Sequence, residues 1–277
     1  MSYELDRSQI DYFNARGYVI VPGLLSSEET TLLGHIAHSD QGLAAKMLNR
    51  LDTQGGTAQL ALDNGLSENI YSAIVQSARM VHAMEAMLDG EVYHYHHKVS
   101  AKKPFEGGAW EWHQDYGYWY NNGCLFPYMA SCYIAIDPAT KQNGCMQLIS
   151  GSHHMGRIEH GTAGEQTGAN MERVEAALAR LELVYAEMAP GDALFFHSNT
   201  LHRSDQNRSP DPRWGLICCY NAARNDPYKK GGHPNYSPLE VLADEKVAEV
   251  GHKQWAEIQS ALRQEPINSM QMAGAKV

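Results

Sequence analysis

The feature that most constrains the fold is a series of short β-rich runs between about residue 91 and residue 225. Turn-forming Gly, Pro, Asn and Asp residues separate each run from the next. A chain with helices first and many short strands afterwards is typical of a mainly-β sandwich or barrel with helices packed outside. The runs are EVYHYHHKVSAKK, YMASCYIAID, CMQLIS, LVYAEMA, DALFFHSN and RWGLICCYNA.

Residues 1–90 are predicted to be a mainly helical part. SQIDYFNARG has a Ser suited to an N-cap and Gly17 as a stop. SSEETTLLGHIAHSD is predicted to be a second helix with Ser26 or Ser27 as its cap. The segment ENIYSAIVQSARMVHAMEAMLDG predicts a third helix, and YVIVPGLL predicts a short strand after the first.

The end of the chain is again predicted to be helical, over residues 237–264, because Ser237 and Pro238 suit a helix start. TGANMERVEAALARLEL is predicted to be a helical or loop insertion between strands. No low-complexity linker or repeat divides the chain, so we expect one domain over residues 1–277 with a β core at about 91–225.

Composition excludes several classes of protein. The formal net charge of -10 disfavours a nucleic-acid partner, which needs concentrated Lys and Arg. The five cysteines are odd in number and lack CxxC spacing, so neither a disulfide framework nor a structural zinc site is expected. Reduced thiols fit a cytoplasmic location, and the sequence predicts no export signal and no membrane span. A homodimer is one assembly that this sequence allows.

The stretch AWEWHQDYGYWY, residues 109–120, places His113 and Asp115 two positions apart. In an extended strand both side chains project to the same face, so one imidazole and one carboxylate can reach a single ion. The alternative is an incidental polar pair on an aromatic core strand. Two ligands do not make a stable metal site, so a third must come from elsewhere in the sequence.

The best third ligand among the 14 histidines is His202. If the strands on either side of DQNRSPD form a hairpin, His202 lies opposite Arg213, and Ser204 shares their face. His197, five residues earlier, is the rival ligand, and its alternative role is that of a strand residue near the pocket wall.

Two histidines and one carboxylate on one face of an iron ion are the arrangement of non-haem Fe(II) oxygenases. A co-substrate that chelates iron at one end and carries a carboxylate at the other would be held by a fork-shaped cation. Arg213 can pair bidentately with a carboxylate, and Ser204 can add a hydroxyl donor. 2-Oxoglutarate meets that description.

With these residues in view, the chain resembles the phytanoyl-CoA dioxygenase family of Fe(II)/2-oxoglutarate-dependent oxygenases, which includes ectoine hydroxylase. The resemblance covers most of the chain and rests on four segments in order. They are QIDYFNARGYVIVPGLLSSEE, WHQD, IAIDPATKQNGCMQLISGSHHMG and GDALFFHSNTLHRSDQNRSPDPRW.

The resemblance implies a double-stranded β-helix, that is, a cupin-like jelly roll. It implies that His113, Asp115 and His202 bind catalytic iron, and that Arg213 and Ser204 hold 2-oxoglutarate. O2 would be the second co-substrate, with succinate and carbon dioxide as products. A halogenating branch of the family replaces the carboxylate ligand with a small residue, so the presence of Asp115 favours hydroxylation.

Comparison with the ectoine hydroxylase pattern points to Lys98, Tyr116 and Trp119 as positions near the substrate. Aromatic faces attract ammonium groups, and a lysine attracts an anionic group, so a small zwitterion would use both. We expect an aminoethylphosphonate-type compound, including N-trimethylated ones, with a free amino acid or an ectoine-like compatible solute as the alternative. For any one aromatic ring, simple core packing is the competing role.

A function of another class stays open, namely a non-catalytic jelly-roll binding protein. The complete set of iron and co-substrate residues favours the enzyme, because a binding protein does not need all of them. Two other histidine groups have structural interpretations. His94 and His96 in YHYHHK are expected to line a sheet and not to bind zinc, and His153 and His154 to make structural hydrogen bonds.

Overall fold

The computed structural model describes residues 4–264, and its strands form two main antiparallel sheets. The larger sheet has seven strands in the order β1-β11-β6-β13-β4-β3-β2, and the smaller has four in the order β10-β7-β12-β5. Strands β8 and β9 form a separate hairpin. The strands are β1 (Tyr18–Val21), β2 (Leu48–Leu51), β3 (Thr57–Asp63), β4 (Val92–Lys102), β5 (Trp110–His113), β6 (Met129–Ala135), β7 (Met146–Ile149), β8 (His160–Ala163), β9 (Gln166–Ala169), β10 (Leu183–Ala186), β11 (Ala193–His197), β12 (His202–Ser204) and β13 (Arg213–Ala222).

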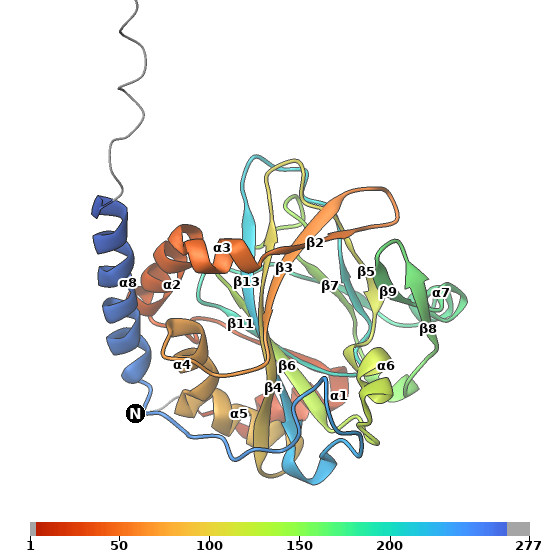
Figure 1. Ribbon diagram of the computed structural model, residues 1–277. Coiled ribbons are helices and arrows are strands. Elements are labelled where there is room, and N and C mark those ends of the chain that lie inside the picture. Colours follow the sequence, from red (N-terminus) through yellow and green to blue (C-terminus); the bar gives the residue numbers. More distant parts are fainter. Residues whose placement is uncertain (1–3, 265–277) are drawn as a thin grey trace, which may run out of the picture.

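Helices cover the outer face of the larger sheet. Figure 1 shows α2, α4, α5 and α8 gathered on one side of the strands, with α7 and the β8–β9 hairpin on the opposite side. Of the two predicted caps of α2 it is Ser26 that caps the helix, and its hydroxyl accepts a hydrogen bond from the Glu29 amide. The helices are α1 (Arg7–Arg16), α2 (Ser27–Ser39), α3 (Gln41–Lys46), α4 (Ile70–Gln76), α5 (Ala78–Leu88), α6 (Asp115–Trp119), α7 (Met171–Leu178) and α8 (Lys246–Gln264).

The two faces of the larger sheet pack into different cores because side chains alternate along each strand. On β6, Cys132 and Ile134 belong to the cluster shared with the helices. Tyr133 and Ala135 belong to the cluster between the sheets, with Leu148 from the smaller sheet. The inner faces of both sheets therefore enclose the space in which a site can form.

The expected mainly-β core with helices outside is confirmed, and each of the six predicted β-rich runs contains a strand. Residues 1–90 contain more β structure than predicted, since β2 and β3 extend the larger sheet. The predicted third helix is two helices, because the chain leaves helical geometry at Ser77. The C-terminal helix begins at Lys246 and not at Ser237.

The predicted hairpin between His202 and Arg213 is wrong. Strand β12 pairs with β5 and β7 in the smaller sheet, whereas β13 pairs with β4 and β6 in the larger one. The segment between them crosses from one sheet to the other, so His202 and Arg213 approach the interior from opposite layers. Within residues 4–264 no helix is long and apolar enough to cross a membrane.

Candidate metal centre and active site

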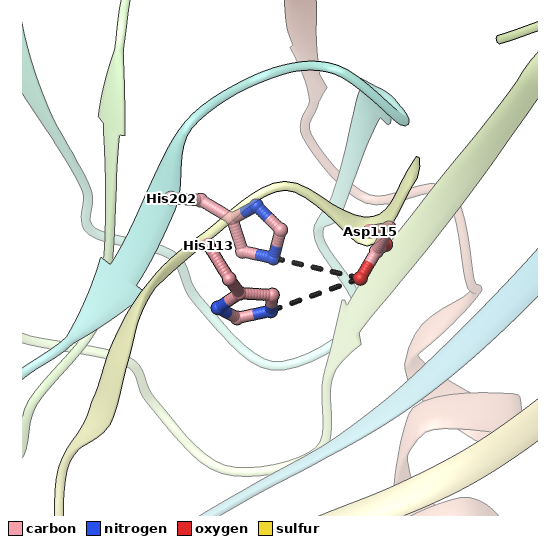
Figure 2. Close-up of side chains that lie close together, drawn as sticks. All are labelled: His113, Asp115 and His202. Atoms are coloured by element: carbon pink, nitrogen blue, oxygen red, sulfur yellow. Dashed lines mark ion pairs between the residues drawn. The ribbon is translucent and has the colours of Figure 1, made fainter. Parts of the chain in front are cut away.

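The structure brings together His113, Asp115 and His202 at the inner face of the smaller sheet (Figure 2). The Oδ1 atom of Asp115 lies 3.7 Å from Nε2 of His113 and 4.0 Å from Nε2 of His202. Because metal–nitrogen and metal–oxygen bonds are about 2 Å long, one ion can contact all three side chains. Among the described residues this is the group of His, Cys, Asp and Glu side chains with metal-binding spacing.

The side chains of the His-x-Asp pair lie close together, as predicted, but the predicted reason for this is wrong. His113 is the last residue of β5, but Asp115 is the first residue of α6, so the two do not share the face of one strand. The turn from strand to helix carries the carboxylate back toward the imidazole. His202 lies opposite His113 in the β12–β5 pairing, which places the second imidazole beside the first.

Hydrogen bonds fix which nitrogen of each imidazole is free. Nδ1 of His113 lies 2.7 Å from the Glu111 carbonyl oxygen, and Nδ1 of His202 lies 2.9 Å from that of Thr200. A carbonyl oxygen only accepts, so each Nδ1 carries the proton and each Nε2 offers its lone pair to the centre. Burial also lowers the pKa of His113 to about 3, with the neighbouring His202 as the next cause, which keeps the ring neutral.

Both oxygens of the Asp115 carboxylate are held in place. The Tyr118 hydroxyl donates to Oδ1 at 2.8 Å, and the Ser131 hydroxyl on β6 donates to Oδ2 at 2.9 Å. Burial raises the pKa of Asp115, but the Lys98 ammonium and the two imidazoles outweigh burial and hold it below its usual range. The group is therefore a charged, oriented carboxylate, as a metal ligand must be.

Gln114, between the two ligands of the His-x-Asp pair, anchors this turn to the rest of the protein. Its side-chain amide donates to the carbonyl oxygens of Gly156 and Asn199, both at 2.8 Å, and accepts from the Ile158 amide at 2.9 Å. The bond to Asn199 connects the turn to the loop that leads into β12. The buried Gln114 side chain thus couples the positions of all three metal-site residues.

Arg213, which lines the same cavity as the three metal-site residues, has unpaired nitrogens in its buried guanidinium. Nε and Nη1 of Arg213 and Oγ of Ser204 are buried and have no hydrogen-bond partner within residues 4–264. Arg213 is 2% exposed, and a buried guanidinium is costly to leave unpaired, so this part of the cavity is suited to an anion. A carboxylate would satisfy the fork of Arg213 and the Ser204 hydroxyl together.

The surroundings of Arg213 hold it in this position. Its guanidinium lies over the ring of Tyr133, 5.5 Å from the centroid. Gly215 makes room for that ring, because a Cβ atom there would collide with it. The buried Lys102 ammonium donates to the backbone carbonyls of Ser204 and Asp205, which anchors the end of β12.

These groups open into one cavity of about 310 Å³. Lys98 and Trp119, predicted to be near the substrate, line it. Tyr116 does not: its ring packs in a cluster with Tyr93 and Tyr95, and its hydroxyl donates to the Cys124 carbonyl at 3.0 Å. The structure therefore gives Tyr116 the alternative role of a core aromatic residue.

The rival histidines lie outside this centre. Nδ1 of His197 accepts from the Asn199 amide at 3.0 Å, and its ring packs between Phe13 and His153. His94 is paired with His97, with a ring-nitrogen separation of 3.0 Å. His96 differs from its neighbours because it faces the cavity.

Sequence reasoning missed several residues of the site. Ser131 and Tyr133 carry no local signal, because each is recognisable only when distant strands are placed side by side. His96 was missed as well. The strand alternation in YHYHHK could have identified His96, since it lies two residues before Lys98 and shares its face.

The known proteins that the chain resembles agree with this architecture. The family model for phytanoyl-CoA dioxygenase (PhyH) matches residues 13–215. L-proline trans-4-hydroxylase of Streptomyces griseoviridis is 27% identical over 82% of this chain and 89% of the relative. Methylphosphonate hydroxylase of Gimesia maris is also 27% identical, over 91% of this chain and 96% of the relative.

Among solved structures, EctD from S. alaskensis, with 2-oxoglutarate and 5-hydroxyectoine, superposes with a TM-score of 0.73. The two sequences are 21% identical, and the match covers 86% of this chain and 88% of the other. This likeness confirms the expected jelly-roll fold.

Proposed function

Because the chain belongs to the phytanoyl-CoA dioxygenase family, we propose that it is an Fe(II)/2-oxoglutarate-dependent dioxygenase that hydroxylates a small zwitterionic metabolite. His113, Asp115 and His202 bind the iron, and Arg213 and Ser204 bind the distal carboxylate of 2-oxoglutarate. The observation that carries the proposal is the pairing, in one cavity, of the metal-binding group with an unpartnered buried guanidinium.

The residues present fit both groups. Two Nε2 atoms and one carboxylate oxygen would hold the ion, and this donor set is the two-histidine, one-carboxylate arrangement of enzymes that keep positions free for co-substrates. When bound, iron supplies the activation of O2, so that 2-oxoglutarate, O2 and a substrate C–H group become succinate, carbon dioxide and an alcohol. Asp115 stands where a halogenating enzyme would lack a carboxylate, which favours hydroxylation.

The protein's own residues orient the reactants. Tyr118 and Ser131 hold the Asp115 carboxylate, and the carbonyls of Glu111 and Thr200 hold the two imidazoles. The aromatic rings that line the cavity give it apolar walls, which strengthen electrostatic interactions inside it.

The substrate that we favour is an aminoethylphosphonate-type compound, including N-trimethylated forms. A cavity of about 310 Å³ suits a small molecule. Lys98 offers a cation for the acidic group, and Trp119 offers an aromatic face for the ammonium group. The relative named methylphosphonate hydroxylase, which aligns along nearly the whole chain, supports a phosphonate.

The second candidate substrate is a free amino acid or an ectoine-like compatible solute. The relative named L-proline trans-4-hydroxylase and the structural likeness to EctD favour this class. A non-catalytic jelly-roll binding protein is the alternative of another kind. It has no need of an oriented metal-binding group, so the hydrogen bonds to both Asp115 oxygens argue against it.

A panel of small zwitterions, assayed for substrate-dependent succinate formation with Fe(II), 2-oxoglutarate and O2, tests the proposal. We expect succinate with an aminoalkylphosphonate and none with the Asp115→Ala variant. Succinate with proline or ectoine alone would select the second substrate class. If no compound of the panel gives succinate in the presence of Fe(II), 2-oxoglutarate and O2, the non-catalytic binding protein replaces the enzyme as the proposed function.

A further inference from the structure

The charged side chains that line the cavity differ in whether they already have an ionic partner or an assigned role. Asp115 belongs to the metal centre, and Arg213 faces the co-substrate end. Arg203 is satisfied by the chain itself, because it donates to Gln147 Oε1 at 3.0 Å and pairs with Asp205 at 3.0 Å. The remaining charged residues of the cavity lining are Arg50, Lys98 and Glu165.

These three side chains have no ionic partner within residues 4–264. Arg50 donates only to the carbonyl oxygen of the adjacent Asn49, at 3.0 Å. No ion pair involves Lys98, although its charge acts on the pKa of Asp115. Glu165 accepts from the Leu51 amide through Oε2 at 3.1 Å, which leaves Oε1 for another donor.

The positive and negative groups come from different elements of the cavity wall. Lys98 lies on β4 and Arg50 on β2, both in the larger sheet. Glu165 lies in the turn of the β8–β9 hairpin, on the side of the smaller sheet, where Figure 1 places this hairpin beside β5. A molecule in the cavity therefore meets two cations on one wall and one carboxylate on another.

The strand β2 and the β8–β9 turn meet at the rim, which is the solvent-accessible edge of the cavity formed by Arg50 and Glu165. The backbone of Leu51 is bonded to Glu165 in both directions, since the Glu165 amide donates to the Leu51 carbonyl at 3.0 Å. Arg50 precedes Leu51, so Glu165 is held beside the strand that carries Arg50. Both side chains line the cavity, and no ion pair joins them within residues 4–264.

From this charge arrangement we propose that Arg50 and Glu165 determine substrate specificity. Arg50 binds a doubly charged oxyanion from the rim, and Lys98, four residues farther along the register of β3, supplies the second cation. Glu165 binds the ammonium group of the same small substrate. Two cations complement a phosphonate dianion better than the single charge of a carboxylate. The inference rests on the proposed function and makes its substrate class specific: a phosphonate that also carries an amine.

Three compounds separate the two contacts: 2-aminoethylphosphonate, ethylphosphonate, which lacks the amine, and β-alanine, which carries a carboxylate in place of the phosphonate. The measured quantity is kcat/KM for substrate-dependent succinate formation. For Glu165→Gln we expect about a tenfold loss of kcat/KM with 2-aminoethylphosphonate, the size typical of a lost charge-assisted hydrogen bond, and little change with ethylphosphonate.

For Arg50→Gln we expect kcat/KM to fall more with both phosphonates than with β-alanine.

Two further variants exclude general effects. Glu172→Gln changes an exposed carboxylate in the first turn of α7, outside the cavity, and should leave the selectivity unchanged. Glu165→Asp keeps the charge and should retain part of the preference for the amine, even if the turn is perturbed.

The results distinguish failure of this inference from failure of the proposed function. If wild-type protein oxidises 2-aminoethylphosphonate and Glu165→Gln loses activity equally with both phosphonates, or with neither, the assigned role of Glu165 is wrong. If Arg50→Gln affects β-alanine as much as the phosphonates, the assigned role of Arg50 is wrong. If no phosphonate supports succinate formation by the wild type, the proposed substrate class itself fails.

Discussion

The inner end of the cavity and its rim are built in different ways. At the inner end, Asp115, Arg213 and Ser204 are at most 2% exposed and lie on or beside strands paired on both sides, or in the turn that Gln114 anchors. At the rim, Arg50 lies on an edge strand and Glu165 lies in a hairpin turn, and both are accessible to solvent.

The difference in burial decides which properties each region can control. Polar groups at the inner end are costly to bury, so each must be bonded within the protein or satisfied by a bound group. Residues at the rim remain hydrated and can change without leaving an unpaired buried charge. The reaction chemistry is therefore assigned to the inner end and the choice of substrate to the rim.

The largest expected effect comes from breaking the metal centre with Asp115→Ala. Losing a group that only supports a ligand costs about 10–100-fold in metal affinity, so losing the ligand itself should cost more than about 100-fold. Calorimetric titration with Fe(II) under anaerobic conditions measures this loss. Asp11→Ala on the surface of α1 is the control, and normal turnover by Asp115→Ala would refute the assignment.

The second largest effect is expected from Arg213→Lys, which should weaken the binding of 2-oxoglutarate. The substitution keeps the charge but loses the planar fork, so the KM for 2-oxoglutarate should rise by about 10–100-fold while iron affinity stays unchanged. Arg203→Lys alters a cavity guanidinium that the chain already satisfies and should leave that KM unchanged. An unchanged KM in Arg213→Lys would place the carboxylate anchor elsewhere.

A smaller effect is expected from Ser131→Ala, which removes the hydrogen bond to Oδ2 of Asp115. Iron affinity should fall by about tenfold, because the carboxylate loses one of the two groups that orient it. Ser77→Ala is a matched control, since this buried serine bonds the Ile74 carbonyl on the helical side of the sheet. Equal iron affinities in the two variants would mean that Ser131 does not support the ligand.

The smallest effect is expected from Trp119→Phe, which changes a buried aromatic residue of the cavity lining. The smaller ring should raise the KM for the substrate by about threefold through a weaker cation–π contact, without changing that for 2-oxoglutarate. Trp214→Phe, on the helix-facing side of β13 beside His38, controls for the loss of an indole. Parallel changes in both KM values would identify Trp119 as a structural residue and weaken the distinction between the two regions.

The inner end was largely predictable from the sequence, and the rim was not. His113, Asp115, His202, Arg213 and Ser204 meet in one cavity as predicted, because their residue types and order carry the signal. Their local geometry was mispredicted twice. The hairpin was inferred from turn residues alone, which do not reveal that the two strands belong to different sheets.

The rim depends on pairings that local patterns do not specify. Strand β2 is short and mostly exposed, so LNRL shows no clear alternation of apolar and polar residues. Its position beside β3 brings Arg50 to the cavity. Tyr116 was placed near the substrate by resemblance, but α6 turns its ring into the core.

The most direct test of the account is an anaerobic titration of the protein with Fe(II) in the presence of 2-oxoglutarate, followed by visible absorption. We expect a weak charge-transfer band that saturates at one iron per chain and is absent from Asp115→Ala. A titration without such a band, or with an equal band in Asp115→Ala, would contradict it.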